Sequence, residues 1–428
     1  MTVSSPTPDG LESDSPPAAT RVGTKAPAAH LVTLFGPAFV ASIAYVDPGN
    51  VAANLSAGSR YGYLLVWVLV AANSMAVLVQ YLSAKLGLVT GRSLPQLLGD
   101  RMPRVPRIAF WIQAEIVAAA TDLAEVIGGA LALQILFGTP LIAGAIIIGL
   151  VSLLLLVVQA RGRQRTFEFI VMGLLGVITF GFMAGLFVSP VDWGGAAGGL
   201  VPRFADTGSV LLAASMLGAT VMPHAIYLHS ALVRDRHGTA TGKGLRRLVG
   251  ATRWDVVCGL AVAGTVNIAM LLMAASSLKG VSGTDSIEGA ASAISGHLGP
   301  AIGVIFGIGL LASGLASTSV GTYAGDAIMK GLLHARVPML ARRAITLIPA
   351  LIIVGAGVDP TWALVLSQVL LSAGIPFAVV PLVWLTSRRS VMGDLANTTW
   401  LRVLAVITVL LIVALNVALL LLTVLGIE

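Results

Sequence analysis

The chain contains 428 residues, of which 57% are hydrophobic and 11% are charged, and its mean hydropathy is +0.93. A soluble domain carries about 25% charged residues, so this composition excludes an ordinary soluble protein and indicates an integral membrane protein. The net charge of +7 does not predict a nucleic-acid partner, because the basic residues are distributed over alternate loops instead of forming one contiguous patch.

The chain begins with a segment that lacks any apolar run. Residues 1–30 are rich in proline, serine, threonine and alanine, and we expect a disordered cytoplasmic tail there. Beyond it, apolar runs of about 18–25 residues, long enough to cross a bilayer, recur to the end of the chain. An all-α membrane protein with eleven spans is therefore predicted: 31–57, 63–84, 108–136, 140–159, 166–188, 209–233, 254–277, 298–329, 342–358, 362–386 and 401–425.

The first span is interrupted at its middle by Asp47-Pro48-Gly49-Asn50. Breaking a helix inside a membrane frees carbonyl groups that lipid cannot satisfy, so the break is expected to line a cavity within the protein. An ionised carboxylate at this depth costs at least about 2.5 kcal/mol, which makes Asp47 a functional candidate. Asp47 and Asn50 offer hard oxygen ligands, and the unwound backbone exposes carbonyls such as that of Ala44.

The third span carries three carboxylates. Glu115, Asp122 and Glu125 fall within roughly an 80° arc of one helix face, because their offsets are seven and ten residues. Acidic side chains on one face of a buried helix commonly mark a proton path. The alternative is a structural network of salt bridges or helix caps.

The sixth span is broken in the same place by Met222-Pro223-His224. The thioether of Met222 is a soft ligand that suits transition metals, whereas calcium and magnesium prefer shells made only of oxygen. With a carboxylate, neutral oxygens and the carbonyl of Ala219, such a site favours Mn²⁺, Fe²⁺, Co²⁺ or Cd²⁺. Ordinary packing is the alternative for Met222. The imidazole of His224 is suited to passing protons near neutral pH.

The two breaks lie 175 residues and five spans apart. An odd number of spans inverts the second half relative to the first, and paired discontinuous helices indicate a transporter's binding site. We therefore predict a first inverted repeat over 31–188, a second over 209–386, and an appended eleventh span over 401–428.

The basic residues follow the positive-inside rule if the N-terminus lies in the cytoplasm. All of the 26 lysines and arginines except Arg60, Arg203 and Lys279 then lie on the cytoplasmic side, and eleven spans leave the C-terminus outside. With no targeting signal before residue 31, we expect a multi-pass protein of a bacterial inner membrane. The single cysteine, Cys258, excludes an intrachain disulfide and a metal site built from cysteines.

Other polar residues in the spans receive less specific interpretations. His224 and His229 are five residues apart, whereas a zinc hydrolase of the HExxH type needs a spacing of four and a glutamate between, so we expect no enzyme. His229 is expected to be a packed histidine. Asp255 and Asp326 lie near the inner ends of spans 7 and 8, where surface ion pairing is expected.

The motifs at both breaks resemble the signatures of the NRAMP family of proton-coupled divalent-metal transporters. The resemblance extends over nearly all of the chain after the tail, through Thr121-Asp122-Leu123-Ala124-Glu125, Tyr227-Leu228-His229-Ser230, Ser317-Thr318 and Ser367-Gln368-Val369. It implies the LeuT-like fold of five plus five inverted spans with discontinuous helices 1 and 6. The implied metal ligands are Asp47, Asn50, Met222, the carbonyl of Ala44 or Ala219, and in some conformations Gln368.

The resemblance also implies a proton route and a transport cycle. The route runs through Asp47, His224, Asp122 and Glu125, with Arg342 or Arg343 as the counter-charge at its exit. The implied function is import of Mn²⁺, with Fe²⁺ close behind and also Cd²⁺ and Co²⁺, driven by protons through alternating access. We expect a monomer without a resident cofactor. The alternatives are an organic-solute symporter of the same fold, such as an amino-acid carrier, and a passive channel or metal sensor.

Overall fold

The chain is helical throughout the part that the computed structural model describes, namely residues 36–160, 164–238, 242–284, 286–334 and 337–425. No strand occurs in these ranges, which confirms the predicted all-α class. The predicted tail, 1–30, lies outside them.

Each of the eleven predicted spans corresponds to a helix or a pair of half-helices. In chain order they are α1 (Pro37–Ser42) with η2 (Ile43–Val46) and α2 (Pro48–Tyr61), α3 (Val66–Thr90), α5 (Arg104–Phe137), α6 (Leu141–Ala160), α7 (Gln164–Val188), α9 (Thr207–Thr220) with α10 (Pro223–His237), α11 (Gly242–Ser277), α13 (Pro300–Leu332), α14 (Met339–Gly355), α15 (Pro360–Thr386) and α17 (Thr399–Leu425).

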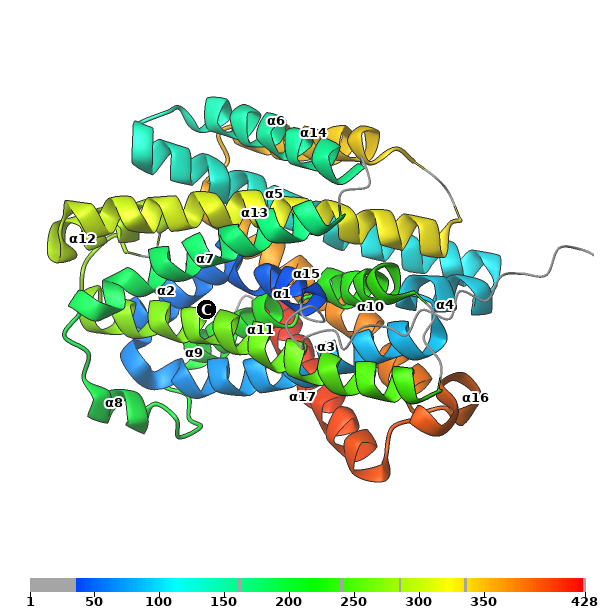
Figure 1. The fold of residues 1–428 in the computed structure, drawn as a ribbon. Coiled ribbons are helices and arrows are strands. Elements are labelled where there is room, and N and C mark those ends of the chain that lie inside the picture. Colours follow the sequence, from blue (N-terminus) through cyan, green and yellow to red (C-terminus); the bar gives the residue numbers. More distant parts are fainter. Residues whose placement is uncertain (1–35, 161–163, 239–241, 285, 335–336, 426–428) are drawn as a thin grey trace, which may run out of the picture.

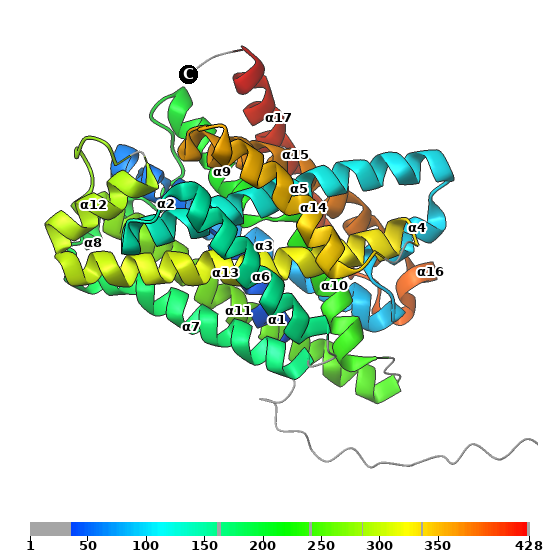
Figure 2. The ribbon, with the colours of Figure 1, turned by 90° about the horizontal axis from the view of Figure 1, so that it is seen from above.

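The short helices lie in the connections. They are η3 (Gly62–Leu65), α4 (Leu94–Arg101), α8 (Trp193–Gly198), α12 (Ile287–Leu298), α16 (Arg389–Met392) and η4 (Gly393–Leu395). Helices α8 and α12 lie at one end of the bundle, and α4 and α16 lie at the opposite end (Figures 1 and 2).

Eight helices in the described residues are long and apolar enough to cross a membrane. The difference from eleven has local causes. The break divides the first span, so that its first half, Pro37–Val46, is short on its own and its second half continues through η3 into α3. The fourth and ninth spans are helices too, but the described apolar part of α6 runs only over Leu141–Leu154, and α14 has 17 residues.

The bundle places the two broken helices at its centre. Helices α6 and α14 lie together on one side, outside α5 and α13, which run next to each other (Figure 1). Helix α17 packs on α15 and α9 on the other side. The half-helices of the first break pack against α5, α11, α13 and α15, and those of the second break pack against α3, α5, α13 and α15.

Close contact between α5 and α13 depends on small residues. A β-carbon on Gly314 of α13 would lie 2.9 Å from the Cα of Gly129 on α5 and 3.1 Å from the carbonyl oxygen of Glu125. Backbone atoms cannot move aside as a flexible side chain can. This contact sets the distance between the two helices that carry the carboxylates and the polar residues opposite them.

Gly314→Leu is expected to lower the free energy of unfolding by about 1–3 kcal/mol, because it overpacks this contact. The measurement is the midpoint of thermal unfolding in detergent. Gly173→Leu on α7 is the matched control, since a β-carbon there meets no atom within 4 Å. Equal midpoints for the two variants would show that α5 and α13 can separate at no cost.

Candidate functional site

The first break is a helix start built around Asp47. Its backbone is extended, with φ −70° and ψ 166°, and Pro48 occupies the first position of α2. Oδ1 of Asp47 accepts hydrogen bonds from the backbone N–H of Asn50 at 2.8 Å and from its side-chain amide at 2.6 Å. Oδ2 of Asp47 is buried and has no hydrogen-bond partner among the described residues. One carboxylate oxygen is thus used for capping, and the other is left for a ligand.

Side chains from distant helices hold the carbonyl groups that the first break frees. The amide of Asn267 on α11 donates to the carbonyl of Tyr45 at 2.7 Å, and the hydroxyl of Ser313 on α13 donates to the carbonyl of Val46 at 2.5 Å. Asn54 of α2 donates in turn to Oδ1 of Asn267 at 2.8 Å. These bonds fix the broken segment to the surrounding helices. Ala44, a predicted carbonyl ligand, lies in η2 just before the break.

The second break repeats the arrangement of the first. Helix α9 ends at Thr220, Met222 is extended with φ −77° and ψ 125°, and Pro223 begins α10. The side-chain amide of Asn50 donates to the carbonyl of Ala219 at 2.9 Å and so joins the two breaks directly. A metal ion that binds the Ala219 carbonyl has to displace or share this hydrogen bond.

Gln368 of α15 lies against the first break. Both polar atoms of its side chain are buried without a hydrogen-bond partner in the described part of the chain, and a β-carbon on Gly49 would collide with its amide and lie 3.3 Å from Oδ2 of Asp47. Gln368 and Asp47 therefore converge over Gly49. Buried polar groups normally have partners, so this pair of unsatisfied side chains indicates a place for a polar or charged ligand.

The predicted carboxylates of α5 lie close together. The carboxylate oxygens of Glu125 and Asp122 would come within 3.2–3.4 Å of a β-carbon on Gly321 of α13, so both extend over that glycine. Asp122 pairs with Arg343 at 3.0 Å, and Glu115 pairs with Arg342 at 2.7 Å.

Both arginines come from α14 and are buried, Arg343 completely. The resemblance implied one of the two as a counter-charge, and in the structure each of them forms an ion pair with an acidic residue of α5. The ion pairs also agree with the alternative of a structural network. Oε2 of Glu125 is buried without a hydrogen-bond partner in the described residues.

The two histidines of α10 have different surroundings. Nδ1 of His224 lies 3.3 Å from the hydroxyl of Thr121, one residue before Asp122 on α5. His224 thus links the second break to the carboxylates. Nδ1 of His229 lies 2.8 Å from Oε1 of Gln80, whose amide donates to the hydroxyl of Tyr45 at 2.7 Å. His229 is packed, as predicted, but within a polar chain that leads to the first break.

Polar contacts close the bundle at the end where α4 lies. On α10, Arg234 donates to Oε1 of Gln96 at 2.6 Å, Asp235 accepts from the hydroxyl of Tyr323 at 2.5 Å, and Arg236 pairs with Glu168.

The prediction for Asp255 was wrong. This side chain is buried and accepts hydrogen bonds from the backbone N–H groups of Gly36 and Ala38, so it caps the start of α1 instead of forming a surface ion pair. Asp326 does form an ion pair, with Lys330 at 2.7 Å, as predicted.

The site is closed on both sides in this structure. Asp47 is 1% exposed and Met222 is 0% exposed, and Met222 belongs to the main hydrophobic core. The geometry brings together Asp47, Asn50, Ala219 and Gln368 through the contacts given above, and Met222 directly precedes the second half-helix. The site offers the unpaired Oδ2 of Asp47, several neutral oxygens and one sulfur. This donor set fits a partly dehydrated transition-metal cation.

The sequence matches the family model described as natural resistance-associated macrophage protein-like over residues 38–422. A Mycobacterium tuberculosis H37Rv protein named divalent metal cation transporter MntH is 61% identical over 397 residues, which cover 92% of this chain and 92% of that protein. A Bacillus subtilis protein of the same name is 46% identical over 389 residues, which cover 90% of this chain and 91% of that protein.

Solved structures show the same architecture. The Eremococcus coleocola manganese transporter, in complex with an aromatic bis-isothiourea substituted compound, has a TM-score of 0.83 at 32% identity, covering 91% of this chain and 86% of that chain. Mhp1, a transporter of the nucleobase-cation-symport-1 family, has a TM-score of 0.58 at 18% identity, covering 91% of each chain. This second likeness concerns the fold alone and confirms the predicted LeuT-like arrangement.

Proposed function

We propose that this chain, which belongs to the natural resistance-associated macrophage protein-like family, imports divalent transition-metal ions across a bacterial inner membrane and is driven by protons. The cargo is Mn²⁺, with Fe²⁺ close behind, and Cd²⁺ and Co²⁺ are also carried. The ions are substrates, and the protein acts as a monomer without a resident cofactor. It is a transporter and not an enzyme.

One observation carries the proposal, namely that the two breaks meet around unsatisfied ligand atoms. Oδ2 of Asp47 and the side chain of Gln368 are buried without partners in the described residues, while Asn50 connects Asp47 to Ala219. The carboxyl ends of η2 and α9 direct the negative ends of their helix dipoles toward a cation held there. Asp47, Asn50, Met222 and a carbonyl of Ala44 or Ala219 replace the hydration shell, and Gln368 joins them in some conformations.

A proton leaves Asp47 when the metal binds, because a carboxylate must be ionised to hold a cation. It passes through His224 to Asp122 and Glu125 and leaves beside Arg343, Arg342 and Glu115. The contact between His224 and Thr121 and the convergence of Asp122 and Glu125 over Gly321 support this route. The metal and the proton thus take separate paths from a shared starting point.

Asp122→Asn and Glu125→Gln are expected to reduce metal-driven acidification of the vesicle lumen to background while metal uptake persists. Each change removes a proton-accepting group from the route and leaves the ligands at the breaks intact. The measurement is lumenal pH, with a trapped dye, during Mn²⁺ uptake. Asp326→Asn is the control, because Asp326 pairs with Lys330 outside the route. Acidification at the wild-type rate in both Asp122→Asn and Glu125→Gln would contradict the proposed proton route.

Alternating access requires the contacts at the α4 end to break in turn. Three contacts hold α10 and α1 against the other helices, namely Arg236 with Glu168, Asp235 with Tyr323, and Asp255 with the start of α1. We place this end in the cytoplasm, because most basic residues lie there, which puts the N-terminus inside and the C-terminus outside. Release of these contacts lets α1 and α10 swing away and opens the site inward.

The proposal is tested by Mn²⁺ uptake into proteoliposomes with and without an inward proton gradient. We expect uptake that the gradient stimulates, that Cd²⁺ competes and that Ca²⁺ leaves unchanged. Metal uptake at the same rate with and without the proton gradient would indicate a passive channel. Absence of metal uptake by folded protein would favour the organic-solute symporter. Against that alternative, the carboxylate of Asp47 would repel the carboxylate of an amino-acid substrate.

A further inference from the structure

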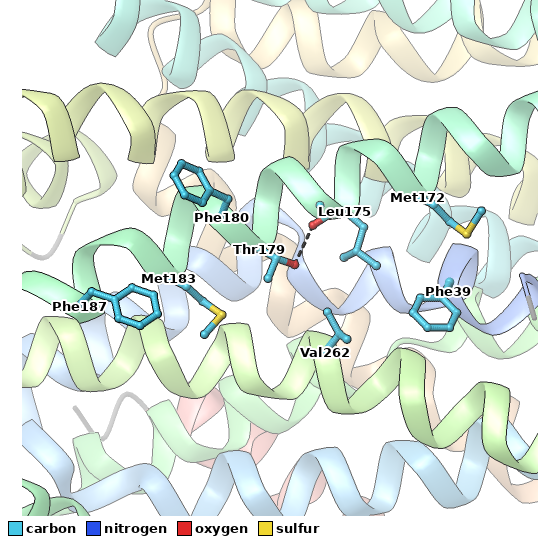
Figure 3. Close-up of a pocket in the computed structure, with 9 residues that line it drawn as sticks. Phe39, Met172, Leu175, Thr179, Phe180, Met183, Phe187 and Val262 are labelled. Carbon is cyan, nitrogen blue, oxygen red and sulfur yellow. Dashed lines mark hydrogen bonds between the residues drawn. The ribbon is translucent and has the colours of Figure 1, made fainter. Parts of the chain in front are cut away.

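An apolar groove lies on the outer surface of the bundle, between α7, α11 and α1. It has a volume of about 510 Å³ and is lined on α7 by residues three or four positions apart, so that it follows one face of that helix. Figure 3 shows Met172, Thr179, Met183 and Phe187 along α7 with Val262 of α11 and Phe39 of α1 facing them. None of the lining residues belongs to either break, so the transport site does not account for the groove.

The groove offers very little polar surface to a ligand. Its only hydroxyl, that of Thr179, donates to the carbonyl of Leu175 at 2.7 Å within α7 (Figure 3). The remaining lining is aliphatic, aromatic or thioether. A polar solute would lose its hydration here without compensation, so the occupant has to be a hydrocarbon.

The position of the groove identifies the source of that hydrocarbon. Helix α7 is long and apolar enough to span the membrane, and Phe180 and Phe187 are 67% and 82% exposed on it. In a bilayer such a face meets lipid. From Met172 to Phe187 the groove follows fifteen residues, or about 22 Å of helix, which is most of the roughly 30 Å hydrocarbon core. An extended acyl chain fits this shape.

One face of α11 carries the features of a lipid headgroup site toward its basic end. Arg247, Trp254, Cys258 and Val262 fall within roughly an 80° arc, in the order charge, aromatic, thiol and groove wall. Arg247 and Cys258 are exposed and Trp254 is 60% exposed. Tryptophan is enriched where the bilayer meets water, and basic side chains next to it attract anionic lipids.

We propose that this groove binds one acyl chain of an anionic phospholipid from the leaflet at the α4 end, with the headgroup near Arg247. The chain runs along α7 and packs against Phe39. Because Phe39 belongs to α1, the short half-helix that ends at the first break, a bound chain supports α1 on the side that faces the membrane.

Cys258 is the only cysteine and is exposed on the face of α11 that leads to the groove, so the unmutated protein can be labelled there with a bimane fluorophore. The labelled protein is reconstituted in phosphatidylcholine vesicles that contain phosphatidylglycerol brominated along its chains. In a second series, phosphatidylcholine carries the bromine. We expect half-maximal quenching at a mole fraction about fivefold lower for the brominated phosphatidylglycerol, the preference that one basic residue near the surface provides.

Two variants on α7 separate the groove from ordinary lipid contact. A β-carbon on Gly176, which lines the groove, or on Gly173, which does not, meets no atom within 4 Å, so leucine is tolerated at either place. Gly176→Leu fills the groove and is expected to abolish the preference, whereas Gly173→Leu retains it. Arg247→Gln is expected to make the mole fraction for half-maximal quenching nearly the same for the two brominated lipids.

Equal quenching by both lipids, or a preference that survives Gly176→Leu, would overturn the proposal and leave only ordinary contact with surrounding lipid. Native mass spectrometry of unlabelled protein provides a second measurement. One phosphatidylglycerol is expected to remain bound to the wild type and to Gly173→Leu and to be absent from Gly176→Leu. Neither measurement involves metal or a proton gradient, so its result is independent of the proposed transport.

Discussion

Asp47→Ala is expected to reduce Mn²⁺ uptake at least about thirtyfold. Loss of one charged partner from a buried site costs about 2 kcal/mol or more, and here the cation would face only neutral ligands. The same change removes the group that releases the proton, so the residual uptake is expected to lose its response to the gradient. Uptake of Mn²⁺ into proteoliposomes, with and without an inward proton gradient, measures both effects.

Asp359→Ala is the matched control for Asp47→Ala. Asp359 also caps a helix that begins with a proline, and its carboxylate accepts from the N–H of Trp362 at 2.7 Å, but it is exposed at the start of α15. It therefore reports the loss of a cap without the loss of a ligand. Wild-type uptake by Asp47→Ala, or an equal loss in Asp359→Ala, would show that Asp47 does not bind the metal.

The breaks were predictable because their causes are local. Proline at the first position of a half-helix has no N–H to donate and fixes its own φ, so Pro48 and Pro223 mark helix starts in the sequence itself. The capping by Asp47 also follows from neighbours in the chain, since its partner is Asn50 three residues later. The structure confirms both helix starts.

The residues that hold the first break in place were not predictable. Asn267 and Ser313 lie more than two hundred residues from the carbonyl groups that they bind. A polar residue in an apolar span signals a partner, but only the packing of α11 and α13 decides which one. Gln80 was missed for the same reason, because its two partners, Tyr45 and His229, belong to different broken helices.

The environment of Asp255 could not be predicted from its position near the end of a span. In the sequence it lies next to Arg253 and Trp254, which indicates a solvated helix end. In the fold, the start of α1 packs there, and its free N–H groups need acceptors. The carboxylate is buried because it supplies them. Only the three-dimensional path of α1 reveals this role.

Met222→Ala is expected to change the selectivity of the site among ions more than the rate of Mn²⁺ uptake. The thioether is the one soft ligand in the proposed set, so its loss is expected to weaken binding of Cd²⁺ and Mn²⁺ roughly tenfold, as the loss of a metal-site interaction commonly does. Calcium gains little from sulfur, and its exclusion is expected to be relaxed. The measurement is competition of Mn²⁺ uptake by Cd²⁺ and by Ca²⁺, followed by direct Ca²⁺ uptake.

Met216→Ala separates the ligand role of Met222 from its packing role. Both methionines are buried in the same broken helix, but Met216 lies inside α9, six residues before Met222. Truncating either one leaves a comparable cavity, which costs about 2–5 kcal/mol of stability. If Met222 is only a packing residue, both variants lose stability and keep the same order of ions. If it binds the metal, the ratio of Cd²⁺ to Ca²⁺ competition falls in Met222→Ala alone.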